Sequence, residues 1–510
     1  MFKPNSLFYS DGYKVGHRAM LAPGTLQLMG NWIPRSTKHS PGGISKIVSF
    51  GQQLTVKWLH DEFTENFFNQ PREVATQFGV DMSLYLGLPY DSSHFGQLHD
   101  LGYLPIRIKS LPEGIETPAN VPHMTFINTV DGFAWLTLYL ETIISSLAWK
   151  PATSATIALQ YRRNLVKWIA KTDPTNMWLI DYLAHDFSAR GLSPWDMLSS
   201  GLGHATSFRG SDTLIVIPGA RYFYNEASAQ VAINSVNAAE HSVATTKIFT
   251  VGEQQMISDW LDLFPTGIFS LISDTFDLFE LITKYLPNLK EKIMHRDGKL
   301  VIRPDSGNPV DIVCGLEGKE GYTLIERDGK PRLRNIDTGV SNEVSEAEVK
   351  GVIELLWDIF GGTVNEQGYK VLDPHIGAIY GDSITIGRQE EIYERLAEKG
   401  FACTNIVLGV GSYTYQMNTR DTFGFAAKGC WFRTADHEYN IYKDPKTDDG
   451  TKISRKGRLC VLEDLTVLTE CTAEQEAGGI LQVIYSNGVF YNQTTLTQVR
   501  ERIKKLSENV

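Results

Sequence analysis

Cysteine is scarce in this sequence, and its placement argues against two common uses of the residue. The chain has five cysteines in 510 residues, and none of them belongs to a Cys-x-x-Cys pair. Neither a disulfide framework nor a zinc site is therefore indicated. We expect reduced thiols, mostly in the core, at Cys314, Cys403, Cys430, Cys460 and Cys471.

The sequence also has no excess of positive charge and no long hydrophobic run. Its net charge of -11 argues against a protein whose whole surface binds nucleic acid. The start of the chain lacks the continuous apolar segment of a signal peptide, and the most apolar stretch, 133–149, contains Glu141. That stretch predicts a packed helix, and we expect a cytoplasmic protein whose partners are neither nucleic acid nor membrane.

Glycine-rich nucleotide motifs are missing as well. The chain has no Walker A sequence, and "GVGSYT" (409–414) lacks the third glycine of the dinucleotide fingerprint. The sequence thus gives no sign of a P-loop or of a dinucleotide-binding fold.

Both ends of the chain mix strand and helix patterns. Strand-like segments at 46–51 and 104–111 are followed by a helical pattern at 154–172. Near the other end, 481–492 reads as a hairpin and 496–506 as a basic helix. These parts predict an α+β arrangement.

A different pattern begins near residue 205, where apolar runs end in Gly, Ser or Asp and most are followed by a helical pattern. The runs are "TLIVI" (213–217), "IFSLISDTFD" (268–277), "LVIRPDSGNP" (300–309), "IGAIYGDS" (376–383) and "NIVLGVGS" (405–412). Such βα units predict a parallel sheet, either closed as a barrel or open. The charged stretch 317–339, built around Asp328 and Gly329, predicts a hairpin inserted at the surface.

Ligands of parallel α/β sheets sit at the carboxyl ends of the strands. We therefore expect one shared mouth, formed by Asp277, Arg303, Asp305, Asp382 and Gly411.

Two of these strand ends carry an unusual density of charge. In "RPDSGNP" (303–309), Arg303 can donate to one part of a ligand while Asp305 accepts from another, or the two can form an internal ion pair. In "SDTFD" (273–277), Asp274 fits the N-cap of a helix that begins near Phe276. Asp277 is less easily explained by capping.

Four further positions admit a functional and a structural interpretation. His241 follows small residues and is either a core histidine or a base or nucleophile. Phe187 beside Arg190 suits a flat heterocycle, or is simply core. Asp212 precedes an apolar run and fits a turn. The lysine-rich stretch 443–458 is a solvated loop or a phosphate clamp.

Taken together, these stretches resemble the nicotinamide phosphoribosyltransferases, which are type II phosphoribosyltransferases of NAD salvage. The matches run in the family's order through nearly the whole chain: "DGYKVGH", "LPIRIKSLPEG", "ETIISSLAW", "HDFSARG", "GSDT", "AAEHS", "SDTFD", "IRPDSGNP", "GDS", "TRD", "YKDP" and "SRKGRL". The resemblance implies an α/β fold with a central irregular (β/α) barrel at 151–419. A flanking α+β domain would combine 1–150 with 420–510.

The resemblance also implies an activity. In that reaction nicotinamide displaces pyrophosphate from carbon 1 of phosphoribosyl pyrophosphate, with Mg²⁺, and ATP acts as a facilitating co-substrate through a phosphohistidine. The enzyme would be a pentosyltransferase that works as a homodimer with shared active sites.

Roles for individual residues follow from the same resemblance. Asp277 and Asp305 would hold the ribose, Arg303 the nicotinamide amide and the diphosphate, and His241 would be phosphorylated. Phe187 and Tyr13 of the other subunit would stack on the pyridine ring, while Asp212 would accept from the amide NH₂ and disfavour nicotinate. The other substrate-binding positions are Arg190, Ser273, Gly381, Asp382, Gly411 and Ser412, of which Ser412 replaces a glycine of the family. The basic residues around diphosphate and ATP would be Arg35, Arg420, Lys428, Lys443 and Lys452; no metal ligand is assigned.

Three alternatives stay open. A nicotinate phosphoribosyltransferase shares the architecture, although Asp212 argues against it. A sugar-phosphate lyase or isomerase would need a Schiff-base lysine or a zinc-type histidine cluster at a strand end, and the series offers neither. A non-catalytic sensor of NAD metabolites would keep the binding site without turnover.

Overall fold

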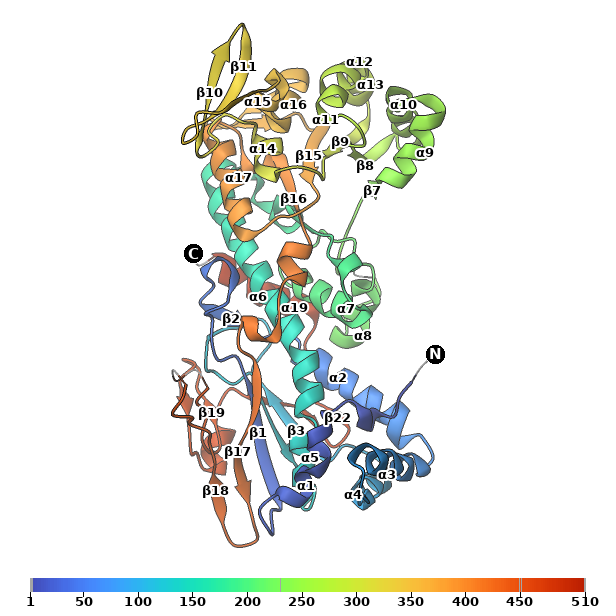
Figure 1. The fold of residues 1–510 in the computed structure, drawn as a ribbon, viewed down its shortest axis with the longest axis vertical. Coiled ribbons are helices and arrows are strands. Elements are labelled where there is room, and N and C mark those ends of the chain that lie inside the picture. Colours follow the sequence, from blue (N-terminus) through green and yellow to red (C-terminus); the bar gives the residue numbers. More distant parts are fainter. Residues whose placement is uncertain (1–2, 230, 449, 451, 509–510) are drawn as a thin grey trace. The chain divides into compact units, whose positions relative to one another are not determined.

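The chain divides into two compact units in the computed structural model, which describes residues 3–229, 231–448, 450 and 452–508. The first unit combines Met1–Ile157, Ile217–Gln230 and Asn418–Leu506, and the second combines Ala158–Val216, Val231–Met417 and Ser507–Val510. The long helix α6 (Glu141–Thr172) contributes residues to both (Figure 1). Residues 217–230 belong to the first unit although they lie between two segments of the second, and no sequence pattern indicated this.

The first unit is built on an antiparallel sheet to which both ends of the chain contribute strands. Its order is β18 (Glu438–Asn440), β17 (Ala426–Arg433), β1 (Gln27–Ile33), β5 (Met124–Asn128), β3 (Ile106–Ser110), β21 (Gln482–Ser486) and β22 (Val489–Phe490). The hairpin predicted at 481–492 is thus confirmed as β21 and β22.

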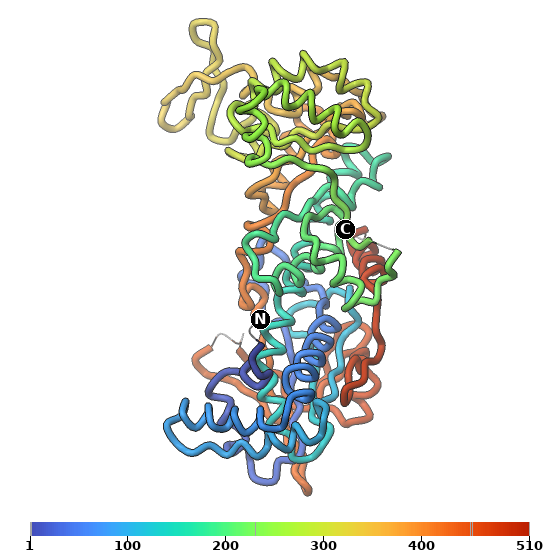
Figure 2. The backbone as a smooth tube through the Cα atoms, turned by 90° about the vertical axis from the view of Figure 1, so that its right-hand side faces the viewer, coloured from blue at the N-terminus to red at the C-terminus, as the bar shows by residue number. Residues whose placement is uncertain are grey.

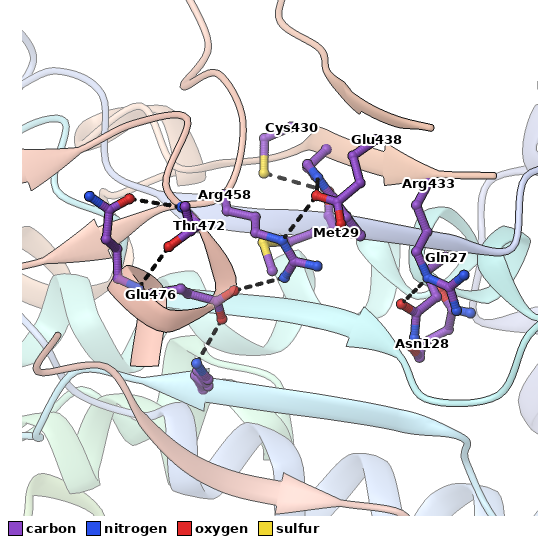
Figure 3. Close-up of polar contacts among 12 residues, drawn as sticks. Gln27, Met29, Asn128, Cys430, Arg433, Glu438, Arg458, Thr472 and Glu476 are labelled. Carbon is purple, nitrogen blue, oxygen red and sulfur yellow. Dashed lines mark hydrogen bonds and ion pairs between the residues drawn. The ribbon is translucent and has the colours of Figure 1, made fainter. Parts of the chain in front are cut away.

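Aromatic and paired polar side chains hold this sheet together. Trp32 of β1 is fully buried and stacks on Phe425, with ring centroids 4.4 Å apart. Arg458 lies over the ring of Trp431 and bonds to Glu476 at 2.9 Å, so its charge is paired although the side chain is largely buried. Figure 3 shows the side chains of Arg458 and Glu476 pointing toward one another. Burial of a charge is tolerated here because it is paired and hydrogen-bonded.

Helices complete the first unit. They include α2 (Gln52–Phe63), α3 (Glu73–Leu86), α4 (Ser93–Leu101), α5 (Ala134–Tyr139) and α19 (Leu496–Glu508). The packed helix predicted at 133–149 is found as α5 and the start of α6, and the basic C-terminal helix as α19. Among the described residues, we find no helix that is both long enough and apolar enough to cross a membrane.

The second unit contains the predicted parallel sheet. Six strands run in the order β6 (Ala184–Asp186), β16 (Ile406–Val410), β15 (Ile376–Tyr380), β9 (Asp297–Arg303), β8 (Thr266–Ile272) and β7 (Asn237–Ala238), and all neighbours are parallel (Figure 1). Isolated bridges pair Asp186 with Ser211 and Gly210 with Asn234. Asp186 is the last residue of β6, and Asn234 lies just before β7, so residues 210 and 211 connect the two edges of the sheet. The sheet therefore curls toward closure, which confirms the irregular barrel.

One predicted strand is wrong. Residues 213–217 ("TLIVI") turn at Leu214 and then enter α8 (Val216–Tyr224). Val216 is fully buried from its helical position, so burial of an apolar run does not by itself distinguish strand from helix. The bridges at Gly210 and Ser211 take the place that this run was expected to fill.

Helices follow most strands of this sheet, as predicted. They are α7 (Pro194–Ala205), α9 (His241–Val251), α10 (Glu253–Leu263), α14 (Pro309–Cys314), α16 (Val352–Phe360) and α17 (Ile386–Glu398). The predicted insertion is a hairpin of β10 (Tyr322–Arg327) and β11 (Lys330–Asn335), extended by β12 (Ser341–Glu343). Asp328 and Gly329 both have positive φ at its tip, as a tight hairpin turn requires. Figure 2 shows this hairpin, in yellow, standing away from the rest of its unit.

All five cysteines are free and buried, as predicted. Burial raises the pKa of Cys314 to about 12, so this thiol is a poor nucleophile.

Candidate active site

The parallel sheet brings most of the predicted site residues to one end of the second unit. Phe187 follows β6, Gly411 follows β16, Gly381 follows β15, Ser273 follows β8, and Arg303 is the last residue of β9. Of the five residues expected at a shared mouth, Arg303 and Gly411 thus lie at strand carboxyl ends, and Asp305, Asp382 and Asp277 follow the ends of β9, β15 and β8.

The loop after β9 is held on several sides. Ser273 N donates to Arg303 O at 3.1 Å, and Arg303 N donates back to Ser273 Oγ at 3.2 Å. Gly381 N donates to Pro304 O, and a Cβ on Gly381 would lie 3.2 Å from that of Asp305. Asn308 then caps α14, with Pro309 at its first position. This loop presents Arg303 and Asp305 from a fixed backbone.

A cavity of about 440 Å³ lies along the inside of the curled sheet. At the end near the strand carboxyl termini it is lined by His185, Phe187, Asp212, Ser235 and Arg303. The ring of Phe187 is 4.7 Å from that of His185, with the planes tilted by 40°. An aromatic wall thus stands beside an acceptor, Asp212, and a donor, Arg303.

The Asp212 carboxylate is supported by two donors. His185 Nε2 lies 3.1 Å from Asp212 Oδ1, and Ser235 Oγ donates to the same oxygen. Burial raises the pKa of Asp212, but hydrogen bonds from His185 and Ser235, with the charges of His185 and Arg303, outweigh burial and leave the pKa below its ordinary value. Asp212 is therefore ionised at neutral pH, and it accepts hydrogen bonds from residues outside the turn considered above.

Arg303 faces the same cavity. Burial lowers the pKa of its guanidinium, while Asp305, Asp212 and Asp274 oppose that effect. Its Nη2 donates to Ala239 O, whereas Nε is buried without a hydrogen-bond partner among the described residues. Because a buried donor left unpaired is unfavourable, this nitrogen is suited to an acceptor on a ligand.

A second cavity, of about 410 Å³, shares Phe187 with the first. Its lining also includes Arg190, Gly381, Asp382, Gly411 and Ser412. A Cβ at Gly411 would lie 3.6 Å from the backbone of Phe187, an ordinary van der Waals contact, so Gly411 packs directly against that segment. The mixture of backbone, hydroxyl and guanidinium donors is typical of a phosphate site.

His241 stands at the start of α9 beside two carboxylates. Its Nε2 lies 3.4 Å from Asp305 Oδ1 and 3.7 Å from Asp274 Oδ1, while Nδ1 lies 3.4 Å from Thr275 Oγ1. Asp274 was not among the expected site residues, because its sequence pattern is that of a helix cap.

Asp274 does not cap a helix, and the helix begins at Leu278 rather than at Phe276. Asp277 is the N-cap of α11 (Leu278–Glu280) and accepts from Glu280 N at 2.9 Å. Asp274 instead accepts from Asp305 N at 2.9 Å. The structure thus brings Asp274 to His241 and Asp305, and gives Asp277 a capping contact.

The remaining candidates lie in the first unit. Burial lowers the pKa of Arg35, and the nearby charge of Arg420 lowers it further, against Asp421 and Asp448. Lys452 N donates to Asp448 Oδ2, and Lys428 pairs with Glu141 at 3.2 Å. Glu141 and Arg420 both act on the pKa of Tyr13, which burial raises. Lys443 N donates to Ser454 Oγ at 2.8 Å.

These contacts place four of the candidates of the first unit near one another: Tyr13, Arg35, Arg420 and Lys428. A bound anion would relieve the mutual repulsion of the Arg35 and Arg420 guanidiniums, which is consistent with the diphosphate role that the resemblance implies.

One cluster of side chains has groups that could hold Mg²⁺. His241, Asp274 and Asp305 bring one ligand atom each to within 4.8 Å of one another. Mg²⁺ prefers carboxylate and phosphate oxygens to imidazole nitrogen, and it usually shares its ligands with a substrate phosphate. Asp305, with 32% of its side chain exposed, fits such a shared ion.

The curled parallel sheet joined to an α+β unit defines the fold of the type II phosphoribosyltransferases. The solved structure of nicotinate-nucleotide pyrophosphorylase from Pyrococcus furiosus matches with a TM-score of 0.56 and 14% identity, over 99% of this chain and 96% of that chain. Human nicotinic acid phosphoribosyltransferase matches with a TM-score of 0.51 and 15% identity, over 98% and 93%. At these identities the likeness shows the fold alone.

Sequence comparison identifies the family. The model of the nicotinate phosphoribosyltransferase family matches residues 182–502, and this chain belongs to that family. A nicotinamide phosphoribosyltransferase of Acinetobacter baylyi is 38% identical over 100% of this chain and 99% of its own length. Proteins of the same name from Xanthomonas campestris and Mycoplasma pneumoniae are 30% and 31% identical, over 97% and 89% of this chain and 97% and 95% of their own.

Proposed function

We propose that this protein is a nicotinamide phosphoribosyltransferase, which forms nicotinamide mononucleotide and pyrophosphate from nicotinamide and phosphoribosyl pyrophosphate in NAD salvage. The observation that carries the proposal is the ionised Asp212 at the end of a cavity walled by Phe187, with Arg303 opposite. The relatives of that name support the same conclusion over the full length of the chain.

The first cavity would bind the pyridine ring. Phe187 would stack on one face, Asp212 would accept from the amide NH₂, and Arg303 would donate to the amide oxygen. An amide satisfies both partners, whereas a carboxylate would place a negative charge against Asp212. Nicotinamide is therefore the expected substrate, although the family model is named for nicotinate.

Ribose and leaving group would lie at the mouth between the two cavities. The pyridine nitrogen forms its bond to carbon 1 as the bond from carbon 1 to the pyrophosphate oxygen breaks, and the electron pair of that bond leaves with pyrophosphate. Asp305 would hold a ribose hydroxyl and stabilise the positive charge that develops on the sugar. Asp305 would hold Mg²⁺ together with substrate oxygens, and the ion would supply charge neutralisation to the departing pyrophosphate. Asp277 stays a candidate for the ribose.

The second cavity would hold the 5′-phosphate of the sugar. Arg190 and Ser412 offer side-chain donors, while Gly381 and Gly411 allow close approach of the backbone. The hydroxyl of Ser412, which replaces a glycine of the family, adds a donor to this cavity. Ser273 would act through its bonds to the Arg303 backbone.

His241 is proposed as the residue that ATP phosphorylates, which would make ATP a facilitating co-substrate of the transfer. The imidazole lies 3.4 Å from Asp305, so a phosphoryl group on His241 would be close enough to influence ribose and pyrophosphate binding. This coupling role rests on the resemblance and on that distance.

We also propose a homodimer in which Tyr13 and the basic residues of the first unit serve the partner's active site. The proposal rests on the resemblance, and complementation tests it. At nicotinamide concentrations well below the wild-type KM, Tyr13→Ala and Asp305→Asn chains are each expected to lose most of their activity, whereas mixed dimers contain one intact site and should recover activity. Mixed dimers, isolated by giving the two chains different affinity tags, that stay inactive would contradict shared sites.

The proposed function as a whole is tested by turnover. The purified protein is incubated with phosphoribosyl pyrophosphate, Mg²⁺ and either nicotinamide or nicotinate, and the mononucleotide is separated by chromatography. We expect nicotinamide mononucleotide to accumulate. Nicotinate mononucleotide as the main product would keep the fold and overturn the specificity. Tight binding of nicotinamide mononucleotide without any turnover would favour the sensor.

A further inference from the structure

We infer that Asp274 is the positioning residue of His241, and that it joins this histidine to the loop that carries Asp305. The inference rests on the proposed phosphorylation of His241. It concerns a residue to which the resemblance gives no role and which the sequence pattern assigned to helix capping.

The two oxygens of Asp274 have different surroundings. Its side chain is 5% exposed. Oδ2 accepts from Asp305 N at 2.9 Å and from Ser306 Oγ at 2.5 Å. Oδ1 is buried, has no hydrogen-bond partner among the described residues, and lies 3.7 Å from His241 Nε2. One oxygen therefore anchors the loop, and the other faces the imidazole.

A buried carboxylate oxygen without a donor is unfavourable, and the Nε2–H group of His241 is the donor within reach. Asp305 Oδ1 faces the same nitrogen at 3.4 Å, so two acceptors converge on Nε2. Nδ1 faces the hydroxyl of Thr275, which can donate. These contacts select the tautomer with hydrogen on Nε2 and the lone pair on Nδ1.

This tautomer fixes which nitrogen attacks ATP. The Nδ1 lone pair forms a bond to the γ-phosphorus as the bond from that phosphorus to the bridging oxygen breaks, and ADP leaves with that electron pair. The hydrogen on Nε2 stays in place, and the positive charge of the ring is shared with Asp274 and Asp305. Since Asp274 also holds the backbone of Asp305, a change at His241 is transmitted directly to that loop.

Two substitutions separate the two contacts. In Asp274→Asn the amide oxygen can still accept from Asp305 N, but its NH₂ group faces Nε2 and favours the opposite tautomer. We expect the KM for phosphoribosyl pyrophosphate without ATP to stay within about threefold, while phosphorylation by radiolabelled ATP falls at least about tenfold or moves to Nε2. Asp274→Ala loses both contacts, so its KM should rise as well.

Asp373→Asn is the matched control. Asp373 pairs with His375 at 2.7 Å and precedes the amino end of β15, whereas the site lies at the carboxyl ends. This variant should keep the phosphorylation and the KM of the wild type. If Asp373→Asn lost as much phosphorylation of His241 as Asp274→Asn, the inference would be overturned. Disturbing any Asp–His pair would then be enough to lower phosphorylation.

The wild-type protein provides a test that does not depend on the folding of a variant. Antibodies specific for either phosphohistidine isomer identify the phosphorylated nitrogen, and we expect Nδ1. Phosphorylation at Nε2, or an Asp274→Asn protein phosphorylated at Nδ1 at the wild-type rate, overturns the inference. Nicotinamide mononucleotide formed without any phosphohistidine overturns it too, but leaves the proposed function standing. Phosphohistidine on Nδ1 without any mononucleotide would contradict only the proposed function.

Discussion

Replacing Asp212 by asparagine should weaken the discrimination against nicotinate, because it removes the charge that a nicotinate carboxylate would face. The substitution keeps an oxygen that can accept from the nicotinamide NH₂ and from His185 and Ser235, which support Asp212 now. Its amide nitrogen can in addition donate to a carboxylate.

The magnitude follows from the surroundings of Asp212. Two like charges about 4 Å apart repel by about 4 kcal/mol near a protein surface and by about 1 kcal/mol in bulk water. Since 44% of the Asp212 side chain is exposed and Arg303 lines the same cavity, we take a value of about 2 kcal/mol between these limits. This corresponds to a change of about 30-fold in the ratio of kcat/KM for nicotinamide to that for nicotinate.

The assay measures kcat/KM for both substrates in the wild type and in Asp212→Asn, with Asp373→Asn as the control for a neutralised carboxylate elsewhere in the unit. The ratio should fall mainly because kcat/KM for nicotinate rises. A ratio that changes by less than about threefold, or that changes equally in the control, would remove Asp212 from the specificity argument.

Three further predictions concern other parts of the molecule. His241→Ala should abolish the acceleration by ATP while nicotinamide binding, measured by calorimetry, is largely kept; a variant that ATP still accelerates refutes the phosphohistidine. Phe187→Ala should raise the KM for nicotinamide by about tenfold, since stacking on an aromatic ring contributes about 1–3 kcal/mol, and an unchanged KM excludes that contact. Burial raises the pKa of Glu113 from 4.5 to about 7, against the hydrogen bond from Gln53 N, so the folded state binds more protons than the unfolded state between these values. The contribution of Glu113 to the free energy of unfolding should therefore be largest below pH 4.5 and decrease by up to about 3 kcal/mol as the pH rises through 7. The difference in unfolding free energy between wild type and Glu113→Gln, measured by urea denaturation, should change accordingly between pH 5 and pH 8; the same difference at both pH values would contradict this.

Much of the catalytic unit follows from local patterns in the sequence. Apolar runs that end in "RPDSGNP", "GDS" and "GVGS" predict strands of a parallel sheet, and the parallel arrangement alone gathers Arg303, Gly381 and Gly411 at one edge. His185 could also have been selected, since it lies two residues before Phe187 in a strand pattern and therefore shares its face.

The details that failed depend on contacts between distant segments. Asp274 looked like a cap because capping is judged from the residues that follow it, whereas its actual partners, Asp305 and Ser306, belong to the next strand end. Ser235 supports Asp212 across 23 residues of sequence, a contact with no local signal. Residues 213–217 have the composition of a buried strand, and only their packing shows that they enter a helix.

The central claim is most directly tested by competition. Nicotinamide and nicotinate are supplied together at equal concentration, with phosphoribosyl pyrophosphate, Mg²⁺ and ATP, and the ratio of the two mononucleotides formed at early times gives the ratio of kcat/KM. We predict that nicotinamide mononucleotide predominates in the wild type and that its share falls in Asp212→Asn. An excess of nicotinate mononucleotide in the wild type would contradict the account.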